Sequence, residues 1–448
     1  MSATPLGWLG VVRLGLVQTA LGSIVVLMTS TINRVMIIEL ALPAFVPGLL
    51  VASHYGVQIL RPAWGYGSDV GGRRTPWIIG GMGLLALGGV GAAVATALAA
   101  THLVLGMSLA LFSFLAIGVG VGAAGTSVLT MLATCVAPAR RAAAATTVWV
   151  MMILGFAVTA PLAGHFLDPY SHARLIEVTA AVATLAFTVA TLAVLGVEKN
   201  NRDGRASAAE RPAARQPFRE AIRNVWAEPA ARRFTIFIFV SMLAYSAQEL
   251  IIEPFAGLVF GMTPGETTKL AGMQHGGVLT GMLAVAFMAS FIGGPIFGSL
   301  KLWTVGGCVA SAVSLVAIAA SGYAGPGFSL RAAIFALGFS NGAFAVSAIG
   351  SMMGLAASGA SAREGTRMGL WGAAQAVAFG LGGLVGTVSV DIARHAMGET
   401  RLAFALVFLC EAALFISSAA LALNIGARDP TKQRATSTRV DNPLTAGT

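Results

Sequence analysis

The sequence predicts an all-α membrane protein whose twelve transmembrane helices form two parallel halves of six. Two observations carry this prediction. The chain of 448 residues is 56% hydrophobic and only 10% charged, a composition that no soluble domain of this size has. The apolar residues gather in runs of roughly 20 or more, long enough to cross a bilayer, and one long polar stretch separates six runs from six.

Each predicted span is an apolar run that ends at polar or glycine-rich residues. The twelve runs cover 14–36, 45–66, 77–100, 103–133, 142–166, 174–196, 234–257, 270–297, 302–322, 329–357, 367–391 and 401–424. Because apolar sequence continues beyond the first run, we expect no cleaved signal peptide. The predicted parts are a first half (1–197), a cytoplasmic linker (198–233), a second half (234–425) and a disordered cytoplasmic tail (426–448).

Lysine and arginine predict the orientation, because these residues collect in cytoplasmic loops. With both termini in the cytoplasm, the outer segments hold only six of the 28: Arg34, Arg174, Lys269, Arg331, Arg394 and Arg401. The net charge of +10 therefore indicates topology, and we expect no nucleic-acid partner. The lipid bilayer is the expected surrounding.

A polar loop between the second and third spans carries the spacing G-x-x-x-D-x-x-G-R-R, formed by Gly65, Asp69, Gly72, Arg73 and Arg74. It resembles the cytoplasmic signature of major facilitator superfamily transporters. Asp69 is placed to cap the third helix or to pair with Arg73, as a structural and gating constellation. The alternative is a glycine-rich turn that merely separates two spans.

The two halves also repeat one another. In the matching register Asp69 falls on Pro295, so the second copy of the signature loop lacks its acid. Parallel halves of six spans are how this superfamily is built. The repeat consists of Arg141, Trp149 and Gly164 in the first half and, at the same spacing, Arg363, Trp371 and Gly386 in the second.

The linker carries one amphipathic pattern, because Phe218, Ile222, Val225 and Trp226 share a helical face. This pattern favours a helix on the cytoplasmic membrane surface over a helix that binds a partner. A G-x-G-x-x-G match beginning at Gly120 lies inside an apolar run with no preceding strand. We therefore interpret it as close helix packing and not as a dinucleotide site.

Polar residues inside spans are costly and are candidates for function. The set comprises Asn33, Arg34, Glu249, Glu253 and Glu411. Glu249 and Glu253 lie one turn apart on the seventh span, where they would carry protons, ligate a cation or bind the magnesium of a pigment. The alternative for Glu249 is an ion pair with Arg34, which we predict. For Glu411, in the middle of the last span, we favour a protonated side chain that faces the bundle.

Two histidines fall within spans at similar depth, His54 in the second and His275 in the eighth. A neutral imidazole is a suitable axial ligand for the magnesium of a chlorin, so both are candidate pigment ligands. A hydrogen-bonded packing histidine is the more common role at each position. The sequence suggests no site for a free metal ion.

One phrase is more specific than the superfamily pattern. The residues N-R-V-M-I-I-E-L-A-L-P-A at 33–44, Arg61-Pro62 and G-S-D-V-G-G-R-R-T-P-W-I-I-G-G at 67–81 resemble the PucC-type proteins of phototrophic bacteria. The chain is most similar to the branch labelled a bacteriochlorophyll synthase chain, found among pigment-synthesis genes. The resemblance covers most of residues 10–425.

This resemblance implies a membrane factor that handles bacteriochlorophyll, bound transiently, during light-harvesting complex assembly. It implies light-harvesting apoproteins and the bacteriochlorophyll synthase enzyme as partners, and a photosynthetic cytoplasmic membrane as the location. Since lipid already solvates a pigment, we expect binding at a lipid-facing surface or lateral groove. A glutamate, a backbone carbonyl or water are alternatives to the two histidines as the magnesium ligand.

Two other functions have to be weighed. A proton-coupled transporter of a small or amphiphilic solute would use Glu249 and Glu253. An enzyme that attaches the prenyl tail would need an aspartate cluster for magnesium diphosphate, and the six aspartates show no D-x-x-x-D spacing. The sequence therefore favours a carrier or chaperone over a catalyst.

Overall fold

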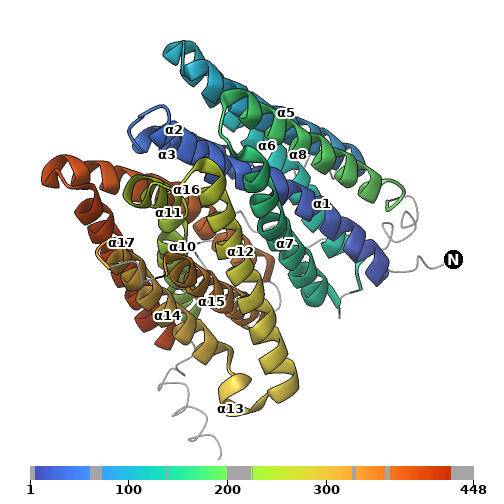
Figure 1. The fold of residues 1–448 in the computed structure, drawn as a ribbon. Coiled ribbons are helices and arrows are strands. Elements are labelled where there is room, and N and C mark those ends of the chain that lie inside the picture. Colours follow the sequence, from blue (N-terminus) through green and yellow to red (C-terminus); the bar gives the residue numbers. More distant parts are fainter. Residues whose placement is uncertain are drawn as a thin grey trace, which may run out of the picture.

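The computed structural model describes residues 6–60, 73–137, 140–198, 223, 226–324, 329–358 and 364–424. The secondary structure in these ranges is helical (Figure 1). Among the described residues, eleven helices are long and apolar enough to cross a membrane, and a further apolar segment, Phe45–Leu60, is shorter. The predicted all-α membrane fold is thus confirmed, and each predicted span corresponds to one of these helical segments.

In the described residues, the first six spans comprise nine helical segments. They are α1 (Trp8–Leu27), the π-helical turn η1 (Met28–Ile32), α2 (Asn33–Ile38), α3 (Phe45–Val57), the 3-10 turn η2 (Gln58–Leu60), α5 (Thr75–Ala99), α6 (Leu103–Cys135), α7 (Arg141–Leu167) and α8 (His172–Val194). The first span, α1–η1–α2, begins six residues before the predicted start.

The last six spans are also built from nine segments. They are α10 (Pro229–Glu249), α11 (Ile252–Phe260), α12 (Pro264–Phe287), the π-helical turn η5 (Met288–Ile292), α13 (Gly294–Phe297), α14 (Leu300–Ser321), α15 (Leu330–Ser358), α16 (Glu364–Met397) and α17 (Thr400–Leu423). Of the predicted amphipathic helix in the linker, Phe218, Ile222 and Val225 lie outside the described residues.

The buried apolar side chains form two main clusters. One cluster consists of buried side chains from the range 11–197 together with Leu250. The other consists of buried side chains from the range 234–422. Figure 1 shows the blue-to-green helices packed beside the yellow-to-red ones. A small cluster of Ile153, Val278 and Met282 joins α7 to α12 across the boundary. This division agrees with the two halves expected from the sequence repeat.

Glycine allows the closest helix approaches. A Cβ on Gly338 of α15 would lie 2.0 Å from the Gln274 carbonyl oxygen of α12, so the two backbones meet directly. Likewise a Cβ on Gly118 of α6 would lie 2.5 Å from the carbonyl oxygen of His54. The glycine-rich run in α6 is therefore a packing surface, as the sequence indicated.

Candidate functional site

Asp391 joins the two halves at one end of the bundle. It lies near the C-terminal end of α16, and its carboxylate accepts hydrogen bonds from the backbone N–H groups of Ala44 (3.0 Å) and Phe45 (2.7 Å). These groups stand at the beginning of α3, in the other half. A carboxylate at a helix N-terminus binds N–H groups without a helical partner and is favoured by the helix dipole.

Asp168 makes the corresponding tie in the opposite direction. It follows α7 of the first half and accepts hydrogen bonds from the Thr263 hydroxyl (3.1 Å) and the Gly265 N–H (3.3 Å) at the beginning of α12. A Cβ on Gly265 would lie only 2.3 Å from the Asp168 carboxylate, so only glycine permits this approach. Each half thus contributes an aspartate that caps a helix of the other.

Arg34 occupies the same end and is only 3% exposed. It pairs with Glu39, five residues further along the chain, and its Nη2 donates to the carbonyl oxygen of Met262 at 2.7 Å. The predicted ion pair between Arg34 and Glu249 is therefore wrong. Glu39 is closer in sequence and reaches the guanidinium from just beyond the end of α2, whereas Glu249 is the half-buried last residue of α10.

The first and seventh spans are both irregular where they meet. The π-helical turn η1 interrupts the first span, and the seventh breaks between α10 and α11. Asn33 bridges this break, because its Nδ2 donates to the Leu250 carbonyl oxygen at 2.8 Å. Thr31 and Thr268 add a hydroxyl–hydroxyl hydrogen bond of 2.9 Å between the halves. Helix irregularities of this kind often occur at functional sites in membrane proteins.

Glu253 lies just after the break, buried at 3% exposure. Its carboxyl lies near Ser30, Thr267 and Arg34. Its Oε2 has no hydrogen-bond partner in the described part of the chain. Glu253 is therefore a buried acidic group near the meeting point of the first and seventh spans, with one carboxyl oxygen unpartnered among the described residues.

Of the signature loop, Gly65, Asp69 and Gly72 are outside the described residues, whereas Arg73 and Arg74 are described and lie at the beginning of α5. Arg73 is exposed, whereas Arg74 is buried and donates from Nη1 to the Thr130 carbonyl oxygen at 3.2 Å. The beginning of α5 is capped by Glu198, which accepts from the N–H groups of Arg74 (2.9 Å) and Thr75 (3.0 Å) and from the Thr75 hydroxyl (2.8 Å). Glu198, at the beginning of the linker, thus caps α5, and the roles expected for Asp69 stay predictions.

Both candidate histidines lie inside the protein. His54 is 1% exposed, and its Nε2 is 2.9 Å from the side-chain nitrogen of Gln58. His275 is buried on α12 with its ring centroid 4.8 Å from that of Phe156 on α7. Neither position is a lipid-facing surface. Their role as pigment ligands stays a prediction. The contacts with Gln58 and Phe156 favour the alternative, that both histidines are packing residues.

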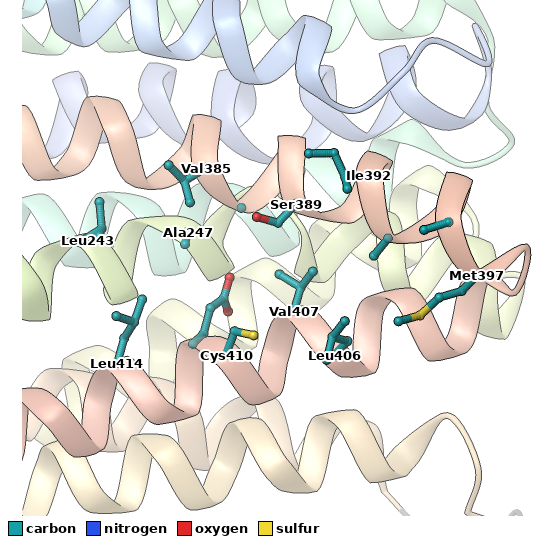
Figure 2. A pocket seen from close by; sticks show the side chains of 14 residues that line it. Leu243, Ala247, Val385, Ser389, Ile392, Met397, Leu406, Val407, Cys410 and Leu414 are labelled. Carbon is teal, nitrogen blue, oxygen red and sulfur yellow. The ribbon is translucent and has the colours of Figure 1, made fainter.

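Glu411 lies in different surroundings, on the wall of a lateral pocket of about 360 Å³ between α10, α16 and α17 (Figure 2). Val385, Ser389 and Ile392 of α16 face Leu406, Val407 and Leu414 of α17. Glu411 is 3% exposed, and neither of its carboxyl oxygens has a hydrogen-bond partner among the described residues. Among the described residues that line the pocket, the others are apolar or uncharged polar residues.

The residues missed from the sequence are acids at helix ends. Asp168, Asp391 and Glu198 follow or end apolar runs, where a carboxylate looks like an ordinary boundary residue. The repeat gives only a near match, since Asp168 follows Trp149 by 19 residues and Asp391 follows Trp371 by 20. In the register of the repeat Asp168 falls on Val390, so the two aspartates do not align.

The fold is similar to those of solved transporters of the major facilitator superfamily. A proton-dependent oligopeptide transporter superimposes with a TM-score of 0.67 at 15% identity, over 93% of this chain and 98% of that chain. The nucleoside transporter NupG superimposes with a TM-score of 0.64 at 12% identity, over 94% of this chain and all of that one. At such identities the likeness concerns the fold alone.

Sequence relatives are more informative. The "Bacteriochlorophyll synthase 44.5 kDa chain" of Rhodobacter capsulatus is 53% identical over 94% of this chain and 96% of its own length. Protein PucC of Rhodovulum sulfidophilum is 30% identical over 88% of each chain. The family model described as PUCC protein matches residues 31–429, which include the inter-half ties and the lateral pocket. The chain belongs to the PUCC protein family.

Proposed function

We propose that this protein is a membrane assembly factor that handles bacteriochlorophyll and delivers it to light-harvesting polypeptides. The observation that carries the proposal is a match to a pigment-associated family along nearly the whole chain, on a fold shared with transporters. A fold that moves one half against the other is suited to binding and releasing a molecule. Light-harvesting apoproteins and the enzyme that completes the pigment are the partners we expect.

The name of the 53% identical relative raises a second possibility, that the protein itself attaches the prenyl tail. We favour a carrier, because prenyl transfer requires carboxylates that hold magnesium diphosphate. Four of the acids described above act differently. Asp168, Asp391 and Glu198 bind backbone N–H groups, and Glu39 pairs with Arg34.

Deletion of the gene in its phototrophic host separates the two functions. An assembly factor predicts loss of antenna absorption while fully esterified pigment is still made. A synthase predicts accumulation of the unesterified precursor. Extracted pigments would be resolved by chromatography and normalised to reaction centres, with a strain complemented by the wild-type gene as the control. Precursor accumulation would refute the assembly role.

One observation favours proton-coupled transport as the alternative, namely the buried, incompletely hydrogen-bonded Glu253 beside the break in the seventh span. Such a carboxyl can exchange a proton as the halves move. Purified protein in liposomes with an imposed proton gradient tests this alternative. Proton movement that requires an added amphiphile and is lost in Glu253→Gln would favour the transporter.

A further inference from the structure

The lateral pocket between α10, α16 and α17 is not used by the inter-half contacts described above. We propose that this pocket is the site at which the protein holds bacteriochlorophyll, with Glu411 donating a hydrogen bond to a carbonyl group on the edge of the macrocycle. The inference rests on the proposed function and identifies where and how the pigment is bound.

The position of the pocket suits a molecule that arrives from lipid. Its rim contains side chains that remain exposed in the structure, among them Ile392 at 64%. In a chain that spans a membrane, such side chains contact acyl chains. A pigment can therefore enter sideways from the bilayer, and be passed on in the same way, without crossing the interface between the halves.

The size and lining of the pocket favour the ring edge of the pigment. A volume of about 360 Å³ lies at the lower end of the range for ligand sites, roughly 300–1,000 Å³. One edge of a chlorin fits, while the rest of the macrocycle and its prenyl tail stay in the lipid. The lining is aliphatic except for Ser389, Cys410, Met397 and Glu411, which matches a flat apolar ring with a few polar groups at its margin.

Glu411 supplies the polar contact. Its carboxyl is buried behind the pocket wall and has no hydrogen-bond partner among the described residues. This arrangement is costly, and a turn of the side chain toward a ligand in the pocket would relieve it. An ionised carboxylate is disfavoured in apolar surroundings, so the neutral acid is the form suited to binding, and its O–H is then a donor. The ring carbonyls of bacteriochlorophyll are acceptors. An acyl chain, which would otherwise fill an apolar pocket open to lipid, offers no acceptor.

Three changes test the site in protein extracted with its native lipids from pigment-producing cells. Glu411→Leu removes the donor and should lower bound pigment about tenfold, as expected for one hydrogen bond in apolar surroundings. Glu411→Gln keeps a donor and should retain most pigment. Ala396→Trp fills the pocket from α16 and should also lower pigment. The control is Leu409→Trp, at an exposed position on α17 outside the pocket.

The wild-type protein provides two independent readouts. Cys410 lines the pocket and is exposed, so bound pigment should slow its reaction with a membrane-permeant maleimide. Resonance Raman spectra should show a ring carbonyl stretch lowered in the wild type and restored in residual pigment of Glu411→Leu. Equal pigment content in wild type, Glu411→Leu and Ala396→Trp, with unprotected Cys410, would overturn the site while leaving the proposed function intact. A wild-type protein that carries only lipid would overturn both.

Discussion

The hydrogen bonds that Asp168 and Asp391 accept across the two halves allow a quantitative prediction about how the halves separate. Asp391 and Asp168 each cap a helix of the opposite half, α3 and α12 respectively. Because these hydrogen bonds cross the boundary between the halves, they exist only when this end of the bundle is closed. Replacing both residues with alanine should therefore favour the open arrangement without disturbing the interior of either half.

The magnitude follows from the capping hydrogen bonds and the charge that each substitution removes. Removing a capping side chain costs about 1 kcal/mol, and removing its charge near the helix dipole adds about 0.5 kcal/mol. Each single variant should then shift the closed–open equilibrium by about 1.5 kcal/mol, roughly tenfold. The two aspartates share no partner, so their effects should add, giving about a hundredfold for Asp168→Ala with Asp391→Ala.

Thr268 provides a reporter, because it is buried between the halves and hydrogen-bonded to Thr31. A Thr268→Cys protein, with Cys135, Cys308 and Cys410 replaced by alanine, would be reacted with a water-soluble maleimide. A buried thiol reacts at a rate proportional to the open fraction. The rate should rise about tenfold in each single variant and about a hundredfold in the double variant.

Glu266 offers a matched control. It caps α12 by accepting the Thr263 N–H at 2.9 Å, but both residues belong to the same half. Glu266→Ala should weaken the helix terminus and change the labelling rate by less than threefold. Equal labelling rates in the control, single and double variants would refute the conclusion that the aspartates hold this end closed.

Three further predictions concern stability and pairing. A double-mutant cycle on Arg34 and Glu39, measured by unfolding in detergent, should give a coupling energy of about 1–3 kcal/mol. Glu198→Ala should lower the apparent Tm by about 1–2 °C, because it removes a cap worth about 1–1.5 kcal/mol from α5. Gly338→Ala should destabilise the α12–α15 contact by about 1–3 kcal/mol, measured against Gly306→Ala, where a Cβ meets no atom within 4 Å.

Each of these predictions has a clear contrary result. Coupling of Arg34 with Glu249 in place of Glu39 would restore the ion pair expected from the sequence. The comparison variant is Glu177→Ala, which removes an exposed glutamate within α8. An unchanged Tm in Glu198→Ala, equal to that of Glu177→Ala, would exclude the capping role. Equal stability of the Gly338→Ala and Gly306→Ala proteins would show that the contact between α12 and α15 tolerates a Cβ at position 338.

The sequence was sufficient for features that depend on composition and local spacing. Apolar runs predicted the spans, since crossing a bilayer needs an uninterrupted apolar length. Spaced glycines in α6 predicted close packing, and the backbone of His54 lies against Gly118. These properties are encoded within one segment and need no knowledge of its neighbours.

The sequence was not sufficient for contacts between distant segments. Asp391 and Ala44 are 347 residues apart, and nothing near either residue indicates the other. The predicted ion pair between Arg34 and Glu249 was wrong because it joined distant segments, whereas the observed partner is near in sequence. Glu39 is only five residues from Arg34, just beyond the end of α2. The lateral pocket depends on how α10, α16 and α17 diverge, so Glu411 could be recognised as an intramembrane acid but not as the wall of a pocket.

The central claim is that this protein binds bacteriochlorophyll, and measuring pigment on the purified protein tests it most directly. The tagged protein would be extracted with its surrounding lipid by a membrane-solubilising polymer, and a transporter of the same fold would be purified from the same cells. We predict bacteriochlorophyll in a fixed molar ratio to the protein, well above that of the transporter. Pigment that follows only the amount of extracted lipid, equally in both preparations, would contradict the claim.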